Sequence, residues 1–92
     1  MILTVFRSRL RPEAQAEYGE LAPQMSKLAR SMPGYKSHKV FVAEDGERLT
    51  LVEFEDDTTQ FDWANHSEHR AAQKRGRSAF YSEYSLQICE VK

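Results

Sequence analysis

Residues 35–54, YKSHKVFVAEDGERLTLVEF, decide the fold. Two runs rich in β-branched and aromatic side chains, 35–43 and 48–54, flank the four residues EDGE. The Asp45–Gly46 pair within EDGE is a strong β-hairpin signal, because these residues adopt the positive φ that tight turns between strands require. The segment therefore predicts two adjacent antiparallel strands.

A helix is predicted before this hairpin. Pro12 suits a first helical position, and Glu13 favours the positive end of the helix dipole. Pro23 interrupts the helical pattern, and its ring would meet the carbonyl of Gly19, which predicts a kink or a break. The segment MPGY, residues 32–35, ends the helix. Apolar or small residues recur at steps of three and four, the helical period, at Ala14, Tyr18, Leu21, Met25, Leu28 and Met32.

A second helix is predicted after the hairpin. The segment EDDTTQF, residues 55–61, opens it, and Asp57 with Gln60 has the spacing of a capping box. The helix is expected to run to about Lys74 and to end near Gly76.

Strands are predicted at both ends of the chain, ILTVFRSRL at 2–10 and AFYSEYSLQICEV at 79–91. The order is then β-α-β-β-α-β, the ferredoxin-like split βαβ arrangement of the α+β class. It places two helices on one face of a four-stranded antiparallel sheet. The 92 residues are expected to form a single domain, 1–92.

Composition excludes several classes of protein. A net charge of -1 supplies no broad positive field for nucleic acid. No segment approaches the roughly 20 apolar residues that cross a bilayer, and the N-terminus does not match a signal peptide, so a cytoplasmic location without a membrane partner is expected. The single cysteine, Cys89, excludes an intrachain disulfide and a Cys-based zinc cage. In a strand expected to be buried, it serves as a small hydrophobic residue.

The strands carry too many apolar residues for one chain to bury. Two helices cover one face of the sheet, and at ~25 cal/mol per Å² a wet second face would forfeit several kcal/mol. We therefore expect a homodimer whose sheets face each other; the alternative is that single apolar residues stay exposed at edges. Both faces are apolar: Ile2 and Phe6 oppose Leu3 and Val5, Phe41 opposes Val40 and Val42, and Leu49 and Leu51 oppose Val52 and Phe54.

The second predicted helix gathers the residues that could carry chemistry. On one continuous helix over 58–74, His69 lies about sixty degrees from a stripe of side chains at steps of three and four. A histidine beside Trp63 in a dry cavity could remove a proton from a phenol-type substrate. The alternatives are that the histidines decorate a solvated helix and that Trp63 seals a dimer seam. The stripe comprises Trp63, His66, Arg70, Gln73 and Arg77.

No metal is expected. His66 and His69 are two ligands, and neither HExxH nor HxxEH is present. A third ligand would have to come from His38, Glu53 or Cys89.

The last predicted strand carries Tyr81 and Tyr84. An odd spacing of three places them on opposite faces of the sheet. One is expected to pack, and the other to reach a cavity or the partner subunit.

The chain resembles the antibiotic biosynthesis monooxygenase family of dimeric α/β-barrel proteins over nearly its whole length. Four segments carry the resemblance: ILTVFRSRL, MPGY, LTLVEFEDD and WANHSEHRAAQKRGRSAFYSEY. The family implies two sheets facing across a dimer, with a pocket in each subunit between sheet and helices. Its characterised members include cofactor-free monooxygenases of quinols and polycyclic phenols, haem-degrading enzymes and small-molecule isomerases.

Haem degradation is not expected from the resemblance. Trp63 matches a tryptophan of the haem-degrading branch, but Ser8 and Gln73 stand where that branch has an asparagine and a histidine. Without that histidine there is no axial iron ligand. Thr50 and Phe54 stand where the quinone-forming branch has an asparagine and a tryptophan, and His69 matches a histidine frequent in the family.

The resemblance implies a monooxygenase without metal or cofactor that oxidises a small phenolic or quinol-like aromatic substrate with O2. His69 or His66 is the expected catalytic base. The alternative is a non-catalytic dimeric module that binds a small hydrophobic ligand. Substrate-binding residues are expected to be Trp63, Arg70, Arg77, Tyr81 and Phe54.

Overall fold

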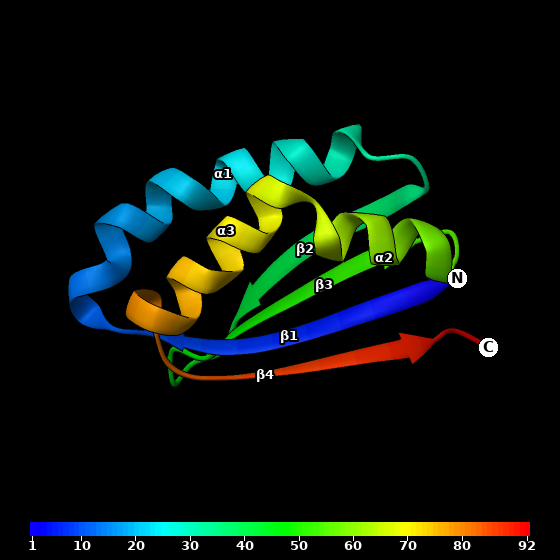
Figure 1. The fold of residues 1–92 in the computed structure, drawn as a ribbon. Coiled ribbons are helices and arrows are strands. Elements are labelled where there is room, and N and C mark those ends of the chain that lie inside the picture. Colours follow the sequence, from blue (N-terminus) through cyan, green and yellow to red (C-terminus); the bar gives the residue numbers. More distant parts are fainter.

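The computed structural model describes all 92 residues and contains one four-stranded sheet with every helix on one face (Figure 1). Neighbouring strands are antiparallel in the order β2-β3-β1-β4. This confirms the expected α+β, ferredoxin-like arrangement. The strands are β1 (Ile2–Leu10), β2 (Tyr35–Val42), β3 (Arg48–Phe54) and β4 (Tyr81–Glu90).

Three α-helices cover the sheet, whereas two were expected. A 3-10 turn, Pro12–Ala14, leads into the first, and a π turn, Gly76–Phe80, follows the last. None of the helices is both long and apolar enough to cross a membrane. The helices are α1 (Gln15–Ser31), α2 (Asp57–Asn65) and α3 (Ser67–Arg75).

The first helix passes through Pro23 without ending, so of the predicted kink or break, the break is wrong. The carbonyl of Gly19 loses its N–H donor to the proline ring. Both Gly19 and Pro23 are on the outer part of the helix, so water can replace the missing donor.

The capping box of α2 lies one residue earlier than predicted, on Asp56 rather than Asp57. The Asp56 side chain accepts a hydrogen bond from the Thr59 backbone N–H at 2.9 Å. In return, the Thr59 hydroxyl accepts from the Asp56 backbone N–H at 3.3 Å. The hydroxyl of Thr59 therefore takes the role expected of the Gln60 side chain.

The continuous helix predicted to reach Lys74 is instead broken at His66. The backbone of His66 is extended, with φ -60° and ψ 134°, and its side chain accepts a hydrogen bond from the Glu68 N–H at 3.2 Å. Asn65 donates its side-chain amide to the Phe61 carbonyl at 2.9 Å. Polar side chains thus satisfy backbone groups on both sides of the break.

The hairpin predicted at residues 44–47 is confirmed. Gly46 has a φ of 90°, and its N–H donates to the Ala43 carbonyl at 2.9 Å. The Ala43 N–H donates to the Glu47 carbonyl at 2.8 Å, which closes the turn.

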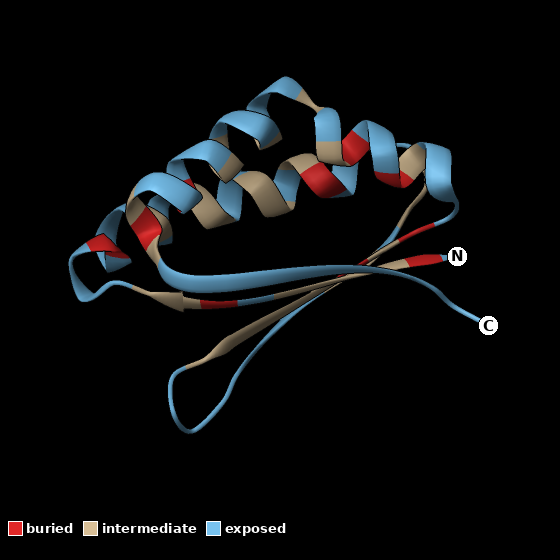
Figure 2. Ribbon diagram, turned by 60° about the horizontal axis from the view of Figure 1, so that its bottom comes forward, coloured by how far each residue is buried: buried red, intermediate tan, exposed pale blue.

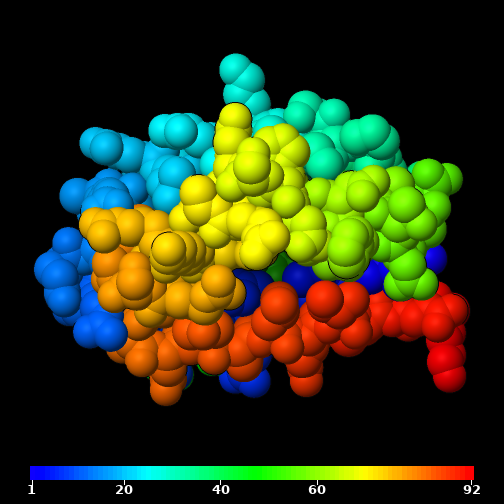
Figure 3. Space-filling model, in the orientation of Figure 1, coloured from blue at the N-terminus to red at the C-terminus, as the bar shows by residue number.

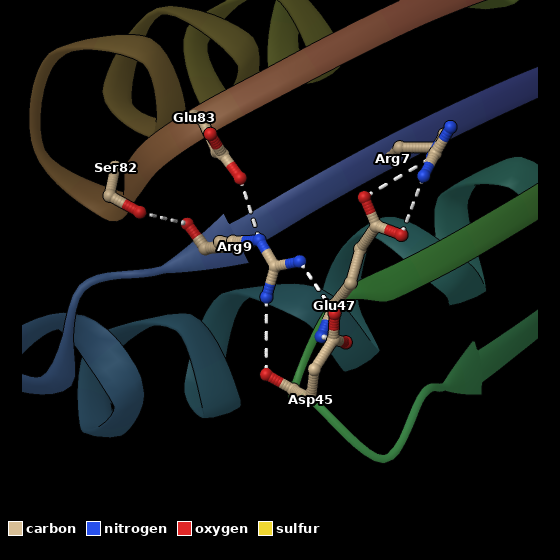
Figure 4. Close-up of polar contacts among 6 residues, drawn as sticks. All are labelled: Arg7, Arg9, Asp45, Glu47, Ser82 and Glu83. Atoms are coloured by element: carbon tan, nitrogen blue, oxygen red, sulfur yellow. Dashed lines mark hydrogen bonds and ion pairs between the residues drawn. The ribbon is translucent and has the colours of Figure 1, made fainter.

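An exposed ion-pair network joins this turn to β1 and β4 (Figure 4). Arg9 pairs with Asp45 at 2.8 Å and with Glu83 at 2.6 Å. Arg7 pairs with Glu47 at 2.8 Å. Because these pairs face solvent, each contributes little to stability, and together they place a charged cluster at one end of the sheet.

The two faces of the sheet differ in what covers them (Figure 2). On the helix-facing side, Val52 and Phe54 pack with Ala29 and Trp63 in the core. Since side chains alternate along a strand, neighbours such as Leu51 point to the helix-free side. The apolar character predicted for both faces is therefore present.

The fourth strand forms an edge that no α-helix covers. Its helix-facing Tyr84, Leu86 and Ile88 are 48%, 56% and 53% exposed. Cys89 is also exposed, so the expectation that it lies in a buried strand is wrong. The reason is its place on the uncovered edge strand next to β1.

Candidate functional site

A cavity of about 290 Å³ lies between the helices and the sheet. Figure 3 shows a hollow between α3 and β4, with atoms of β1 at its bottom. The lining is mostly hydrophobic and contains two arginines and two histidines but no aspartate or glutamate. Such an apolar concavity with a few polar groups is the usual form of a small-molecule site.

Trp63 forms one wall of the cavity and is held by the core. Its side chain is 6% exposed and stacks on Phe54 with ring centroids 6.2 Å apart. The imidazole of His69 stacks on the same indole, with centroids 3.7 Å apart and planes 12° from parallel. The break at His66 lets α3 return His69 to Trp63, which one continuous helix would have separated around its axis.

A hydrogen bond to the backbone determines which ring nitrogen of the neutral His69 imidazole carries the hydrogen. Its Nδ1 lies 3.0 Å from the backbone carbonyl oxygen of Trp63. A carbonyl only accepts, so Nδ1 carries the hydrogen and donates it. The Gln73 amide, 3.4 Å from Nδ1, can donate instead to the Ala64 carbonyl at 3.5 Å. The neutral imidazole is therefore left with an unprotonated Nε2.

Burial lowers the pKa of His69 below its ordinary value of 6.5. The hydrogen bond to the Trp63 carbonyl acts on this pKa in the opposite direction, and the charge of His66 adds to the lowering. His69 is therefore neutral at pH 7 and able to accept a proton at Nε2. The indole face and the Trp63 carbonyl would both stabilise the imidazolium that forms.

A second histidine, His38 on β2, lines the same cavity. Its Nδ1 lies 3.3 Å from the Ser26 hydroxyl of α1. Burial lowers the pKa of His38, and the nearby charge of Arg30 lowers it further. The cavity thus contains two imidazoles that are neutral at pH 7.

Arg77 and Tyr81 also line the cavity, as their substrate-binding assignment requires. Burial raises the pKa of Tyr81 to about 12, so its phenol keeps its proton and can donate a hydrogen bond. Gly76 makes room for the Tyr81 ring, because a Cβ at this position would lie 2.5 Å from the ring atom Cε2. Tyr84 lines the cavity as well, so the expectation that Tyr81 and Tyr84 face opposite sides is wrong. The cause is the register shift between Arg9 and Leu10 where β1 meets β4.

Three other predicted site residues lie outside the cavity lining. His66 caps α3, which uses its Nδ1. Arg70 is exposed on α3. Phe54 is fully buried beneath Trp63 and supports the wall without reaching the cavity. The prediction that His66 and Arg70 share one stripe with Trp63 is therefore wrong, because residues 58–74 form two helices and not one continuous helix.

Three cavity residues were not predicted as such: Arg48 and Thr4 had no predicted role, and His38 was considered only as a metal ligand. All three lie on strands with side chains on the helix-facing side. The alternation of side chains along each predicted strand could have placed these three residues on the helix-facing side. No three His, Cys, Asp or Glu side chains gather in the geometry of a metal site.

The fold and the cavity together define a ferredoxin-like α+β domain with a mostly apolar cavity between helices and sheet. A sequence model of the antibiotic biosynthesis monooxygenase family matches residues 1–75. The chain belongs to this family.

The chain is similar to several known proteins. It is 31% identical to the uncharacterized protein YqjZ of Bacillus subtilis (strain 168) over 87 residues, 95% of this chain and 76% of the relative. The fold matches a conserved protein from Methanosarcina mazei Go1 with a TM-score of 0.87 and 15% identity, over 99% of this chain and 92% of the other. It also matches a mutant of SnoaB, a cofactor-independent oxygenase from Streptomyces nogalater, with a TM-score of 0.83 and 12% identity, over 99% and 92% of the two chains.

The lowered pKa values of His38 and His69 predict how stability depends on pH. In the unfolded chain these two imidazoles take up protons near pH 6.5, whereas in the folded chain they do so only at lower pH. The free energy of unfolding should therefore fall as pH drops below 6.5 and level off below the folded pKa values. Urea unfolding from pH 7.5 to pH 5 measures this fall and stays above the range in which carboxyl groups titrate.

The variant His69→Gln provides the comparison, since it removes one of the two imidazoles whose pKa burial lowers. It should lose less stability than the native chain over the same interval. An equal loss in both proteins would contradict the assignment of His69 as a buried neutral group.

Proposed function

We propose that this protein is a cofactor-independent monooxygenase that oxidises a phenolic or quinol-like small molecule with O2. The observation that carries the proposal is the neutral His69 imidazole, stacked on Trp63 in an apolar cavity with its Nε2 free. The similarity of fold to an oxygenase described as cofactor-independent supports the same function.

His69 acts as the general base in this proposal. Its Nε2 takes the proton of the substrate hydroxyl, and the resulting phenolate is electron-rich enough to reduce O2. A phenol with a free para position is oxidised by four electrons to a quinone. One oxygen atom of O2 enters the ring, and the other leaves as water with two hydrogens from the substrate.

The remaining cavity residues assist this reaction. Trp63 presents an aromatic wall against which a planar ring can stack. Arg77 is the cavity arginine on the helical side and can balance negative charge as it develops on the substrate. The apolar lining excludes water, which strengthens these electrostatic interactions. Arg70 and His66 have no part in this scheme, because both lie outside the lining.

Oxygen uptake with a panel of quinols and polycyclic phenols tests the proposal. Replacing His69 by Gln removes the base and should lower kcat about a hundredfold to ten-thousandfold. The matched control is His66→Asn, which removes the other histidine but retains a good helix N-cap. It should keep nearly full activity.

Equal loss of oxygen uptake in the two variants would contradict the role of His69. Ligand-induced thermal stabilisation of the native chain without any oxygen uptake would favour the non-catalytic binding module instead.

We also propose that the protein is a homodimer through the helix-free faces of its sheets. On this face the central strands β1 and β3 carry an apolar patch made of Leu3, Val5, Leu49 and Leu51. Phe41 of β2, 51% exposed, extends the patch beside Leu49. A contiguous apolar surface of this kind, with the ion-pair network of Arg7 and Arg9 at its end, has the apolar centre and polar rim of an interface.

Sedimentation tests the dimer. The native chain should sediment with twice the mass of one chain at micromolar concentration, and Leu51→Glu should shift it to the monomer by placing a charge at the centre of the patch. The control Phe61→Glu changes a residue of α2 that is 63% exposed and should remain dimeric. A native monomer, or a dimer unaffected by Leu51→Glu, would contradict the proposal.

A further inference from the structure

Arg48 is an unpaired cation in the wall of the cavity. It begins β3, and its guanidinium carbon lies 5.0 Å from the centroid of the Tyr18 ring of α1. Three other arginines, Arg7, Arg9 and Arg75, pair with carboxylates, whereas Arg48 has no carboxylate within 4.0 Å. The stacking on Tyr18 therefore holds the charge in place without neutralising it.

Polar atoms around Arg48 also lack partners. The Arg48 Nε is buried without a hydrogen bond, as is the hydroxyl of Ser8. Ser8 is directly opposite Arg48 in the β1–β3 register, so their side chains share the helix-facing side. The Thr4 hydroxyl, also buried and without a partner, lies further along this side, opposite Val52. Buried polar groups are normally hydrogen-bonded, so the Arg48 Nε and the Ser8 hydroxyl favour a polar ligand group at this end of the cavity.

Tyr81 adds a further donor at this end of the cavity. Its backbone carbonyl accepts from Arg11 at 3.3 Å, but its phenol hydroxyl has no hydrogen-bond partner within the protein. Burial raises the pKa of this hydroxyl, and the positive charge of Arg48 acts against that rise. Since the lining contains no acidic residue, nothing in the chain competes for these donors.

We propose that the substrate carries a carboxylate, which Arg48 binds at the end of the cavity formed with Tyr18 and Tyr81. One guanidinium balances one unit of negative charge and matches the two oxygens of a carboxylate in a bidentate pair. This inference deepens the proposed function and relies on it only for the ring that reacts at the other end.

The length of β3 sets the shape of this substrate. Arg48 and Val52 are four residues apart on one face of the strand, a separation of about 13 Å. Val52 packs with Trp63, the wall on which His69 stacks. The carboxylate and the reacting ring are therefore at opposite ends of an elongated molecule. A cavity of about 150 Å³ holds a benzene ring, so 290 Å³ suits a bicyclic scaffold.

Calorimetric titration with 2-naphthoate and 2-naphthamide tests the proposal. These probes have the same ring system and differ in charge, and neither has a hydroxyl to oxidise, so binding is measured without turnover. The native protein should bind the acid at least about tenfold more tightly than the amide. The variant Arg48→Met should weaken binding of the acid about tenfold to a hundredfold and leave binding of the amide nearly unchanged.

The matched control is Arg70→Met, which removes an exposed arginine outside the cavity and should retain the preference for the acid. The proposal is overturned if native protein binds the two probes alike, if it binds neither at millimolar concentration, or if Arg48→Met keeps the preference. The comparison of probes on native protein holds even if Arg48→Met does not fold. If the native protein binds 2-naphthoate but takes up no oxygen with any phenol, the proposed oxygenase function is refuted and the carboxylate site at Arg48 is retained.

Discussion

The hydrogen bond between His69 and the backbone carbonyl of Trp63 is the interaction on which the proposed chemistry depends. It exists because the second helical segment breaks at His66, which leaves the Trp63 carbonyl near the C-terminal end of α2. That carbonyl accepts from the His66 backbone N–H at 3.2 Å and has a second lone pair for another donor. His69 supplies this second donor after α3 changes direction, and its ring stacks on the indole. One break in a helix therefore fixes the position, tautomer and protonation of the candidate base.

The cavity follows from incomplete coverage of the sheet. The helix α1 packs on β2 and α2 packs on β3, while the helix-facing side of β4 stays open. This arrangement leaves a mouth lined by Tyr84, Leu86 and Ile88 beside a wall held rigidly by Phe54. The helix-free face is exposed for a different reason: no element of the same chain lies on that side of the sheet (Figure 1). In the proposals above, the two exposed surfaces have separate roles, one as the entrance to a site and one as a subunit interface.

The sequence was sufficient for features that depend on neighbouring residues. The Asp45–Gly46 turn, the helical period after Pro12 and the order of strands and helices along the chain needed no tertiary information. The break at His66 could not be predicted from periodicity, because it depends on side chains that cap the new helix. The role of Arg48 depends on the register of β1 against β3 and on Tyr18 above it. Such long-range contacts explain why Arg48 was not among the predicted site residues, whereas Trp63 and His69, six positions apart in the sequence, were.

The most direct test of the account is the tautomer of His69, measured by ¹⁵N NMR of the imidazole nitrogens at neutral pH. We expect a protonated Nδ1, hydrogen-bonded to the Trp63 carbonyl, and an unprotonated Nε2. A hydrogen on Nε2 would contradict the proposed chemistry, because Nδ1, against the Trp63 carbonyl, would then be the only nitrogen left to accept a substrate proton.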